Sequence, residues 1–275
     1  MTKIIIDSEN KVRFFSIKEL WFYRDLFLTL AYRDYKVRYA QTVLGLIWAF
    51  LQPLATLMIF VMIFGKAVKV DTGSVPYPIF AICGMSAWAY FSYVIQQSGS
   101  SIISSQEMVK KVYFPRLIIP LSKAVVGFID YAIAFLFLLV LMLFYRFFPS
   151  PHLIYLPIFI LLTVISSLSL GIWLSALTIR FRDFIHVVPF MIQFGLYATP
   201  VGYPASLVVD SLPEWAVFVY YLNPMAGIIE GFRWSVLGGE IISSYASLSI
   251  ITSISLFISG LIYFRKVERI MADLV

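Results

Sequence analysis

Uncharged, apolar runs alternate with short charged segments along most of the 275-residue chain. A helix needs about 20 largely apolar residues to cross the hydrocarbon core of a bilayer. Six runs reach this length when the uncharged residues that flank the shorter ones are included. The pattern therefore predicts an all-α integral membrane protein with six transmembrane helices. Their expected ranges are 44–64, 79–95, 118–144, 153–177, 187–207 and 248–264.

The segment before the first span, 18–39, has the periodicity of an amphipathic helix, because apolar and polar side chains fall on opposite arcs. The apolar arc carries Tyr23, Leu26, Phe27, Leu30 and Val37, and the polar arc carries Lys18, Asp25, Thr29, Arg33 and Lys36. Asp34 and Arg38 interrupt the pattern. We expect an interface helix on the cytoplasmic membrane surface. It serves either as an anchor only or also as a contact for a cytoplasmic partner or an anionic lipid head.

Two further apolar pieces, 215–222 and 225–237, precede the last span. Asn223-Pro224 separates them, and a helix is disfavoured at the residue before a proline. Since neither piece spans a bilayer alone, we expect an outer helical hairpin at about 213–237. It is either re-entrant, which requires burial in protein or a cavity, or a loop helix that rests on the headgroups.

Composition supports a membrane protein, since 61% of the residues are hydrophobic and 13% are charged, against about 25% charged in a soluble domain. This excludes a soluble enzyme, a disordered tail and a disulfide scaffold. The single cysteine, Cys83, and the two distant histidines, His152 and His186, predict no metal site. The net charge of +6 indicates cytoplasmic Lys and Arg at the membrane edges rather than nucleic-acid binding.

The charges also predict the orientation. Seventeen of the 21 Lys and Arg residues lie before the first span or in the alternate loops and tail on the same side. Both termini are therefore expected in the cytoplasm. The predicted organisation is a cytoplasmic segment with the interface helix (1–43), a transmembrane domain (44–264) and a cytoplasmic tail (265–275).

Three spans carry polar or aromatic side chains at helical spacing on one face. The first carries Gln41, Gly45, Trp48, Gln52 and Thr56, the second Ser86, Tyr90, Tyr93 and Gln97, and the fifth Gln193, Tyr197 and Pro200. Such faces either hydrogen-bond between helices or line a wet pathway, and their aromatic and amide groups suit sugars. The fourth span has a small-residue face, which predicts close helix packing. It comprises Ser167, Gly171, Ser175 and Thr178.

Charged residues near or within the spans suggest further candidates. Asp130 is an intramembrane acid, which is either functional with a partner or a structural, hydrogen-bonded side chain. No basic residue is expected at its depth. Arg33, Lys36 and Arg38 either draw a pyrophosphate toward a pore or are ordinary positive-inside residues. Glu230 and Arg233 have the spacing of a helical ion pair.

The sequence contains no G-x-x-x-x-G-K-[ST] loop, D-x-D, H-E-x-x-H or nucleophile elbow. We therefore expect a conduit, not an enzyme, with its energy supplied elsewhere.

Several motifs resemble one family in their order and spacing. They are 33–39 (RDYKVRY), 42–45 (TVLG) with Trp48 and Gln52-Pro53, 110–116 (KKVYFPR), and Asn223-Pro224-Met225 before Gly231-Phe232-Arg233. The chain resembles the membrane-spanning (permease) subunit of bacterial ABC exporters of polysaccharides and polyols, such as O-antigen, capsule and teichoic acid.

The resemblance implies a homodimer in the inner membrane with two copies of a separate ATPase, which would bind ATP and magnesium. It implies a lipid-pyrophosphate-linked glycan or polyol as substrate and no cofactor in this chain. It places ATPase-coupling helices at about 104–113 and 180–186, with Glu107, Lys110, Lys111 and Arg182 as candidates. By position, the candidate pore residues are Trp48, Gln52, Tyr90, Tyr93 and Tyr197.

The sequence is also compatible with other functions. One is an ABC exporter of drugs or small lipids. Another is a membrane enzyme acting on lipid-linked sugars, for which Asp25 and Asp34 are the nearest pair of acids. A proton-coupled carrier would depend on Asp130 alone.

Overall fold

The computed structural model describes residues 17–39, 47–239 and 242–271, and every regular element in these ranges is a helix. Five helical stretches are long and apolar enough to cross a membrane. They are Ile47–Ala67, Tyr77–Ser104, Ile118–Phe144, Pro151–Arg180 and Ala246–Glu268. These stretches match five of the six predicted spans and confirm the all-α membrane fold class.

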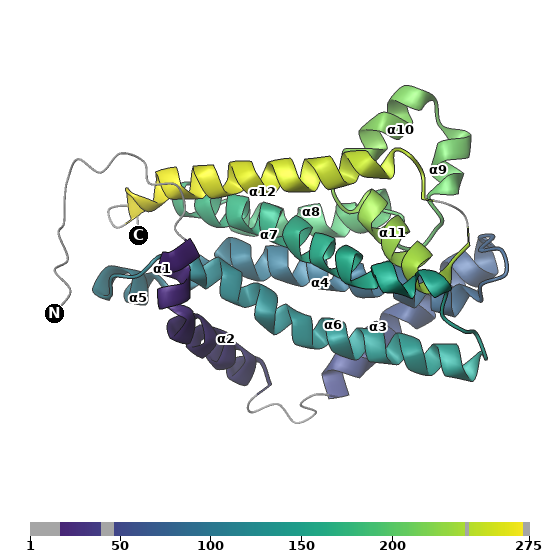
Figure 1. Cartoon of the computed structure of the whole chain (residues 1–275), viewed down its shortest axis with the longest axis horizontal. Coiled ribbons are helices and arrows are strands. Elements are labelled where there is room, and N and C mark those ends of the chain that lie inside the picture. The colour runs from purple at the N-terminus through teal and green to yellow at the C-terminus, as the bar shows by residue number, and fades with distance from the viewer. Residues whose placement is uncertain (1–16, 40–46, 240–241, 272–275) are drawn as a thin grey trace.

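The helices have the following bounds in chain order, where η1 is a π-helix and η2 a 3-10 helix (Figure 1). They are α1 (Ile17–Phe22), α2 (Arg24–Tyr39), α3 (Ile47–Phe60), η1 (Val61–Ala67), α4 (Tyr77–Ser104), α5 (Gln106–Lys111), α6 (Ile118–Phe144), η2 (Pro151–Tyr155), α7 (Leu156–Arg180), α8 (Phe184–Ala198), α9 (Ser206–Ser211), α10 (Glu214–Tyr221), α11 (Ala226–Leu237) and α12 (Ala246–Glu268).

The expected fifth span, 187–207, is not one continuous helix. The helix α8 ends at Ala198, and its 15 residues reach about 22 Å, less than the roughly 30 Å of a hydrocarbon core. Thr199 is extended because Pro200 follows it. The prediction of a helix up to residue 207 is therefore wrong, and the chain instead turns into the short helix α9.

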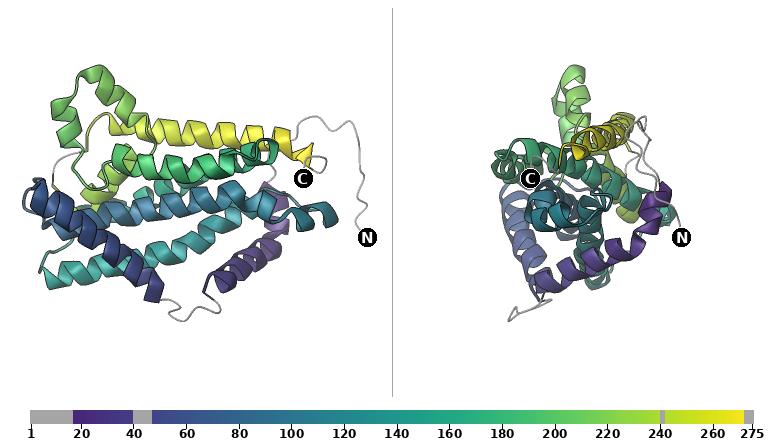
Figure 2. Two further views of the ribbon diagram at one scale, coloured as in Figure 1. Left: turned by 180° about the vertical axis from the view of Figure 1, so that it is seen from behind. Right: turned by 90° about the vertical axis from the view of Figure 1, so that its left-hand side faces the viewer.

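The helix α4 lies at the centre of the bundle, between α6 on one side and α7 and α12 on the other (Figure 2). It is the most buried of the long helices. Its contact with α7 uses the small residues predicted for close packing, because a Cβ atom at Gly171 would lie only 2.9 Å from the Cβ of Ser98. Ser167, Ser175 and Thr178 are also buried, which confirms this packing face.

The N-terminal helix is broken at Tyr23 into α1 and α2, and α2 packs against α6. Leu30 is buried as predicted, and the predicted polar arc is exposed. The prediction that Val37 lies on the buried apolar arc is wrong, since its side chain is 74% exposed. The face that turns toward α6 at this level carries Asp34 and Arg38 instead, the two residues that interrupt the amphipathic pattern.

The two ends of the bundle differ in charge. The helices α1 and α5 and the C-terminal end of α12 lie at one end, and α9, α10 and α11 lie at the other (Figure 1). The first end, here called the basic end, carries the basic segments 110–116 and 265–269. The second is called the hairpin end. The common position of the basic segments agrees with the predicted cytoplasmic side.

The hairpin end contains the two predicted short helices, α10 and α11, with the break at Asn223-Pro224. The Ser249 hydroxyl of α12 donates to the carbonyls of Tyr221 and Asn223, both at 2.8 Å, and accepts from the backbone N–H of Gly227 at 3.0 Å. Most of α11 is buried, whereas α9 and α10 project from the bundle (Figure 1). One serine therefore satisfies the backbone on both sides of the break.

Gly231 permits the close packing of α11 on α7, since a Cβ atom at this position would lie 1.9 Å from the Phe159 ring. We expect Gly231→Ala to destabilise the protein by about 1–3 kcal/mol, the usual range for overpacking. Thermal unfolding in detergent should show a melting temperature several degrees lower. Gly99→Ala is the matched control, because its Cβ would make only ordinary contacts of 3.4 and 3.7 Å. Equal melting temperatures for the two variants would contradict this packing.

Candidate functional site

A cavity of about 900 Å³ lies between α2, α3, α4 and α6. The polar faces of the first two spans meet here, since Gln52 and Thr56 from α3 line it together with Ser86, Tyr93 and Gln97 from α4. Further lining comes from one face of α6 and from the end of α2. The polar faces of α3 and α4 therefore share one cavity instead of packing only against other helices, whereas Gln193, Tyr197 and Pro200 of the predicted fifth span do not line it. Gln41 and Gly45 of the first predicted face lie outside the described residues.

The candidate pore residues occupy different positions in this arrangement. Trp48 and Gln52 line the cavity from α3, and Trp48 is 55% exposed. Tyr93 lines it from α4. Tyr90 reaches the wall but is only 2% exposed, and its hydroxyl donates to the Ala124 carbonyl at 3.2 Å.

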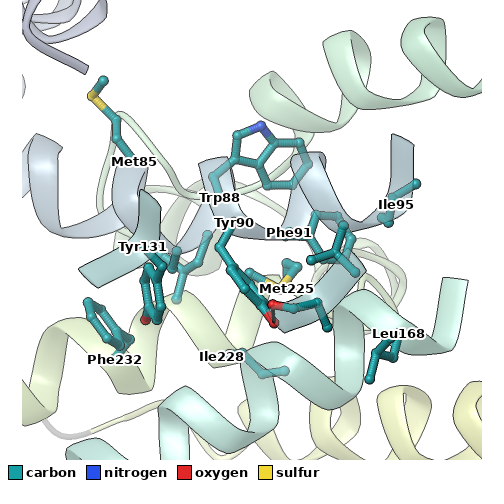
Figure 3. Packing of buried hydrophobic residues seen from close by; sticks show 14 of the residues in the cluster. Met85, Trp88, Tyr90, Phe91, Ile95, Tyr131, Leu168, Met225, Ile228 and Phe232 are labelled. Carbon is teal, nitrogen blue, oxygen red and sulfur yellow. Dashed lines mark hydrogen bonds between the residues drawn. The ribbon is translucent and has the colours of Figure 1, made fainter. Parts of the chain in front are cut away.

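Tyr90 also belongs to a cluster of buried aromatic residues next to the cavity (Figure 3). Its ring lies 5.2 Å from that of Tyr131, which in turn lies 6.0 Å from Phe232 of α11. Tyr197 lies apart from these residues, 63% exposed on α8, and the cavity wall includes its neighbour Leu196 instead.

Two charge pairs join α2 to α6 along the cavity wall. The Lys123 Nζ lies 2.5 Å from Asp34 Oδ2, and the two side chains are 9% and 14% exposed. Asp34 also accepts from Arg33 at 2.8 Å. One helical turn later on the same face of α2, Arg38 forms an ion pair with Asp130, and both side chains are about one-quarter to one-third exposed.

Asp130 is therefore not isolated, and the expectation that no basic residue reaches its depth is wrong. It lies 12 residues into α6, about 18 Å from the start of that helix. The guanidinium comes from α2, whose end reaches this level. Sequence reasoning missed the pair because the two residues are 92 positions apart. The interruption of the amphipathic pattern at Asp34 and Arg38 was the only signal.

Two aromatic residues complete the surroundings of Arg38. Its guanidinium lies 4.2 Å from the centroid of the Tyr93 ring, a cation–π contact. The Tyr39 hydroxyl donates to the second oxygen of Asp130. Burial and this hydrogen bond raise the pKa of Tyr39, so the hydroxyl keeps the proton that it donates.

The three candidate residues for an anion do not form one cluster. Arg38 lines the cavity, whereas Arg33 pairs with Asp34 and Lys36 is exposed to the outside of α2. The four charged residues on the wall comprise two cations and two carboxylates and cancel in formal charge. They are Asp34, Arg38, Lys123 and Asp130. The cavity wall is thus polar and aromatic, and its formal charges sum to zero.

The coupling candidates lie at the basic end. Lys111 and Glu107 form an exposed ion pair of 2.9 Å on α5, and Val109 on the same helix is buried. The expected helix at 104–113 is thus present in a shorter form. Arg182 is exposed between α7 and α8, where 181–183 form no separate helix.

A second charged junction at the basic end was not predicted. The backbone N–H of Arg116 donates to Glu268 Oε1 at 2.8 Å, and its guanidinium donates to the Glu268 carbonyl at 2.7 Å. Arg265 pairs with Glu268 at 3.2 Å and with Glu19 of α1 at 3.7 Å. The loop after α5 is therefore tied directly to α12, and α12 is tied in turn to α1 through Arg265.

Arg233 at the hairpin end has a role that its spacing from Glu230 did not indicate. Its buried guanidinium donates to the carbonyls of Pro200, Val201 and Tyr203, and it lies over the Phe80 ring. These carbonyls follow the end of α8 and have no helical partners. Glu230 instead accepts from the Tyr221 hydroxyl and the Ser243 N–H, each at 2.7 Å.

Within the described ranges, no three His, Cys, Asp or Glu side chains are grouped to hold a metal ion. The model of the ABC-2 type transporter family matches residues 25–237, a range that contains every residue of the cavity wall. The chain belongs to the ABC-2 type transporter family.

The relatives of this ABC-2 family member include exporter permeases. It is 29% identical to an O-antigen export system permease protein RfbA of Klebsiella pneumoniae over 252 residues, which cover 91% of this chain and 95% of that protein. The RfbA protein of Myxococcus xanthus is 29% identical over 217 residues, covering 79% and 82%. The polysialic acid transport protein KpsM of Escherichia coli is 24% identical over 244 residues, covering 87% and 92%.

Because of the cavity, we expect water access to differ between two exposed positions. We expect Gln52→Cys to react with a membrane-impermeant maleimide, because Gln52 lines the polar cavity. Leu136→Cys, 53% exposed but outside that cavity, is the matched control and should stay unlabelled in membranes. The native Cys83 is fully buried and gives no background. Equal labelling of the two variants would show that the cavity is not a separate aqueous space.

Proposed function

We propose that the chain is the permease subunit of an ATP-driven ABC exporter that moves a lipid-pyrophosphate-linked polysaccharide or polyol across the cytoplasmic membrane. The family and the export functions named for its relatives support this class. The observation that carries the proposal is the cavity in which aromatic, amide and paired charged side chains meet between α2, α3, α4 and α6.

The lining suits a glycan better than a purely apolar cargo. Sugar rings pack on aromatic faces such as those of Trp48 and Tyr93, while Gln52 and Gln97 supply donors and acceptors for hydroxyls. Of the three candidate cations of α2, Arg38 lines the cavity and favours an anionic head group, whereas Arg33 and Lys36 lie outside the cavity wall. A pyrophosphate-linked glycan combines these features in one substrate.

A second copy of the chain would complete the pathway. The helices α3 and α8 are short of partners in one copy and expose large apolar side chains. These are Leu51, Met58, Ile59 and Met62 on the first helix with its π-helical extension and Phe190, Met191, Phe194 and Tyr197 on the second. A homodimer that buries these faces would place two cavities about one symmetry axis. Tyr197 would then meet the pathway from the partner side.

The energy would come from two copies of a separate ATPase that binds ATP and magnesium. The chain has no phosphate-binding loop of its own. The exposed helix α5 and the turn at Arg182 are the proposed docking points, with the basic end in the cytoplasm of a bacterium and both termini on that side. The charged junction from Arg116 to Glu268 would carry a displacement of α5 to the last span.

An exporter of drugs or small lipids is the alternative within the same superfamily. Deleting the gene distinguishes glycan export from export of drugs or small lipids. Loss of surface polymer supports glycan export, whereas unchanged polymer with increased drug sensitivity supports the alternative. A membrane enzyme is less well supported, because Asp34 is paired with Lys123 and Asp25 lies exposed on the opposite side of α2.

Replacing two cavity residues should impair export without affecting assembly. We expect Trp48→Ala with Gln52→Ala to lower surface polymer several-fold, because the substrate loses a stacking face and an amide partner. Immunoblotting of polymer in a deletion strain measures the effect, with membrane abundance of the chain as reference. Trp21→Ala removes an exposed tryptophan outside the cavity and should leave export unchanged. Wild-type polymer from the double variant would remove these residues from the pathway.

Charge reversal on α5 tests the docking surface. We expect Lys110→Glu with Lys111→Glu to reduce copurification of the ATPase, because it reverses two charges on an exposed helix and breaks the pair with Glu107. Quantitative mass spectrometry of a mild-detergent pull-down measures the ratio of the two subunits. Lys66→Glu is the control, an exposed lysine after α3 that lies away from the basic end. An unchanged ratio in the α5 variant would place docking elsewhere.

A further inference from the structure

The carboxylate of Asp130 is held by the groups that would hold a phosphate. The Arg38 guanidinium pairs with one oxygen and the Tyr39 hydroxyl donates to the other. Guanidinium and hydroxyl donors bind phosphate oxygens in the same way, and arginine does so with two parallel bonds. Asp130 thus occupies the anion-binding position of the cavity wall.

The position is accessible to an incoming ligand. Arg38 and Asp130 both line the cavity and keep 33% and 25% of their side-chain surface exposed. The Tyr93 ring lies 4.2 Å from the guanidinium on another side, so Arg38 keeps a contact when a carboxylate leaves. An anion that enters the cavity therefore meets a preformed cationic site whose own counter-ion is already bound.

The neighbouring pair has a different character. Lys123 and Asp34 are 9% and 14% exposed, and Asp34 has a second partner in Arg33. This pair fastens α2 to α6 independently of Asp130. The Arg38–Asp130 pair can consequently open while the helices stay joined.

We propose that Asp130 is a built-in competitor for the anion site formed by Arg38 and Tyr39, and that a phosphate-bearing ligand displaces it. The inference rests on the proposed function for the identity of that ligand, an isoprenoid pyrophosphate. Because the four wall charges cancel, the site with Asp130 in place has no net positive charge with which to hold an anion. A pyrophosphate, with more charge and more acceptor oxygens than a carboxylate, competes successfully. The displaced carboxylate then repels the anion and favours its onward movement.

Binding to the intact complex with its ATPase tests the competition. The probe is farnesyl pyrophosphate, titrated by isothermal calorimetry into nanodiscs of zwitterionic lipid. We expect Asp130→Asn to bind on the order of tenfold more tightly than the wild type, because the competing charge is gone while an acceptor for Tyr39 remains. Asp130→Glu retains the competitor and should stay close to wild type. Arg38→Gln should abolish binding in both the wild-type and the Asp130→Asn background.

Controls separate binding from folding and from general charge. Arg24→Gln removes an exposed cation from the same helix, 56% exposed and outside the cavity, and should leave affinity unchanged. If the Asn variant does not purify as a monodisperse complex, Asp130→Thr provides a second neutral side chain. Inorganic pyrophosphate and nanodiscs with phosphatidylglycerol show whether a free phosphate or a phospholipid head also gains affinity in the neutral variant, which supports the same competition.

Unchanged or weaker binding in the neutral variants, or no binding by any of them, would overturn the inference. That failure differs from failure of the proposed function. If deleting the gene abolishes surface polymer but Asp130→Asn binds no more tightly, the exporter assignment holds and Asp130 is structural. If deletion leaves the polymer intact while Asp130→Asn binds more tightly, the site competes for phosphate but serves another cargo.

Discussion

The pairing of charges between α2 and α6 is the constraint on which the site depends. A charged side chain within a membrane is costly unless it has a partner, and here each carboxylate meets a cation from the facing helix. Lys123 with Asp34 and Arg38 with Asp130 together hold α2 at a depth to which an interface helix based on its apolar residues alone would not extend. This position of α2 closes one wall of the cavity and places Arg38 inside it.

The same requirement for satisfied polar groups explains the irregular hairpin end. Backbone that is not helical is tolerated at membrane depth only when protein groups satisfy it. Arg233 does this for the carbonyls after α8, and Ser249 does it for the break between α10 and α11. Asn223 links the two places through a hydrogen bond of 2.7 Å to the Thr199 hydroxyl. The short α8 and the buried α11 are therefore parts of one connected structure.

Local patterns predicted much of this fold. Hydropathy located five long helices, Pro224 marked the hairpin break, and small residues on α7 marked its contact with α4. The length of α8 was misjudged, because an apolar run conceals the effect of Pro200 on Thr199. In the site, helical spacing placed Trp48 and Gln52 on one polar face and Tyr93 on another, and the family resemblance grouped them as pore candidates. Asp130 pairs with a residue 92 positions away, and Arg233 contacts residues 30 to 33 and 153 positions away, so only tertiary packing brings them together.

The proposed function requires that substrate passes through the cavity between α2, α3, α4 and α6. Photo-cross-linking in cells tests it most directly, with a photoreactive amino acid at Gln52 in the cavity or at Leu143 on the outer surface of α6, which is 79% exposed. During active export, glycan should cross-link at position 52 and not at 143, and the signal should disappear when the ATPase is inactivated. Glycan at neither position, or equally at both, would contradict the account.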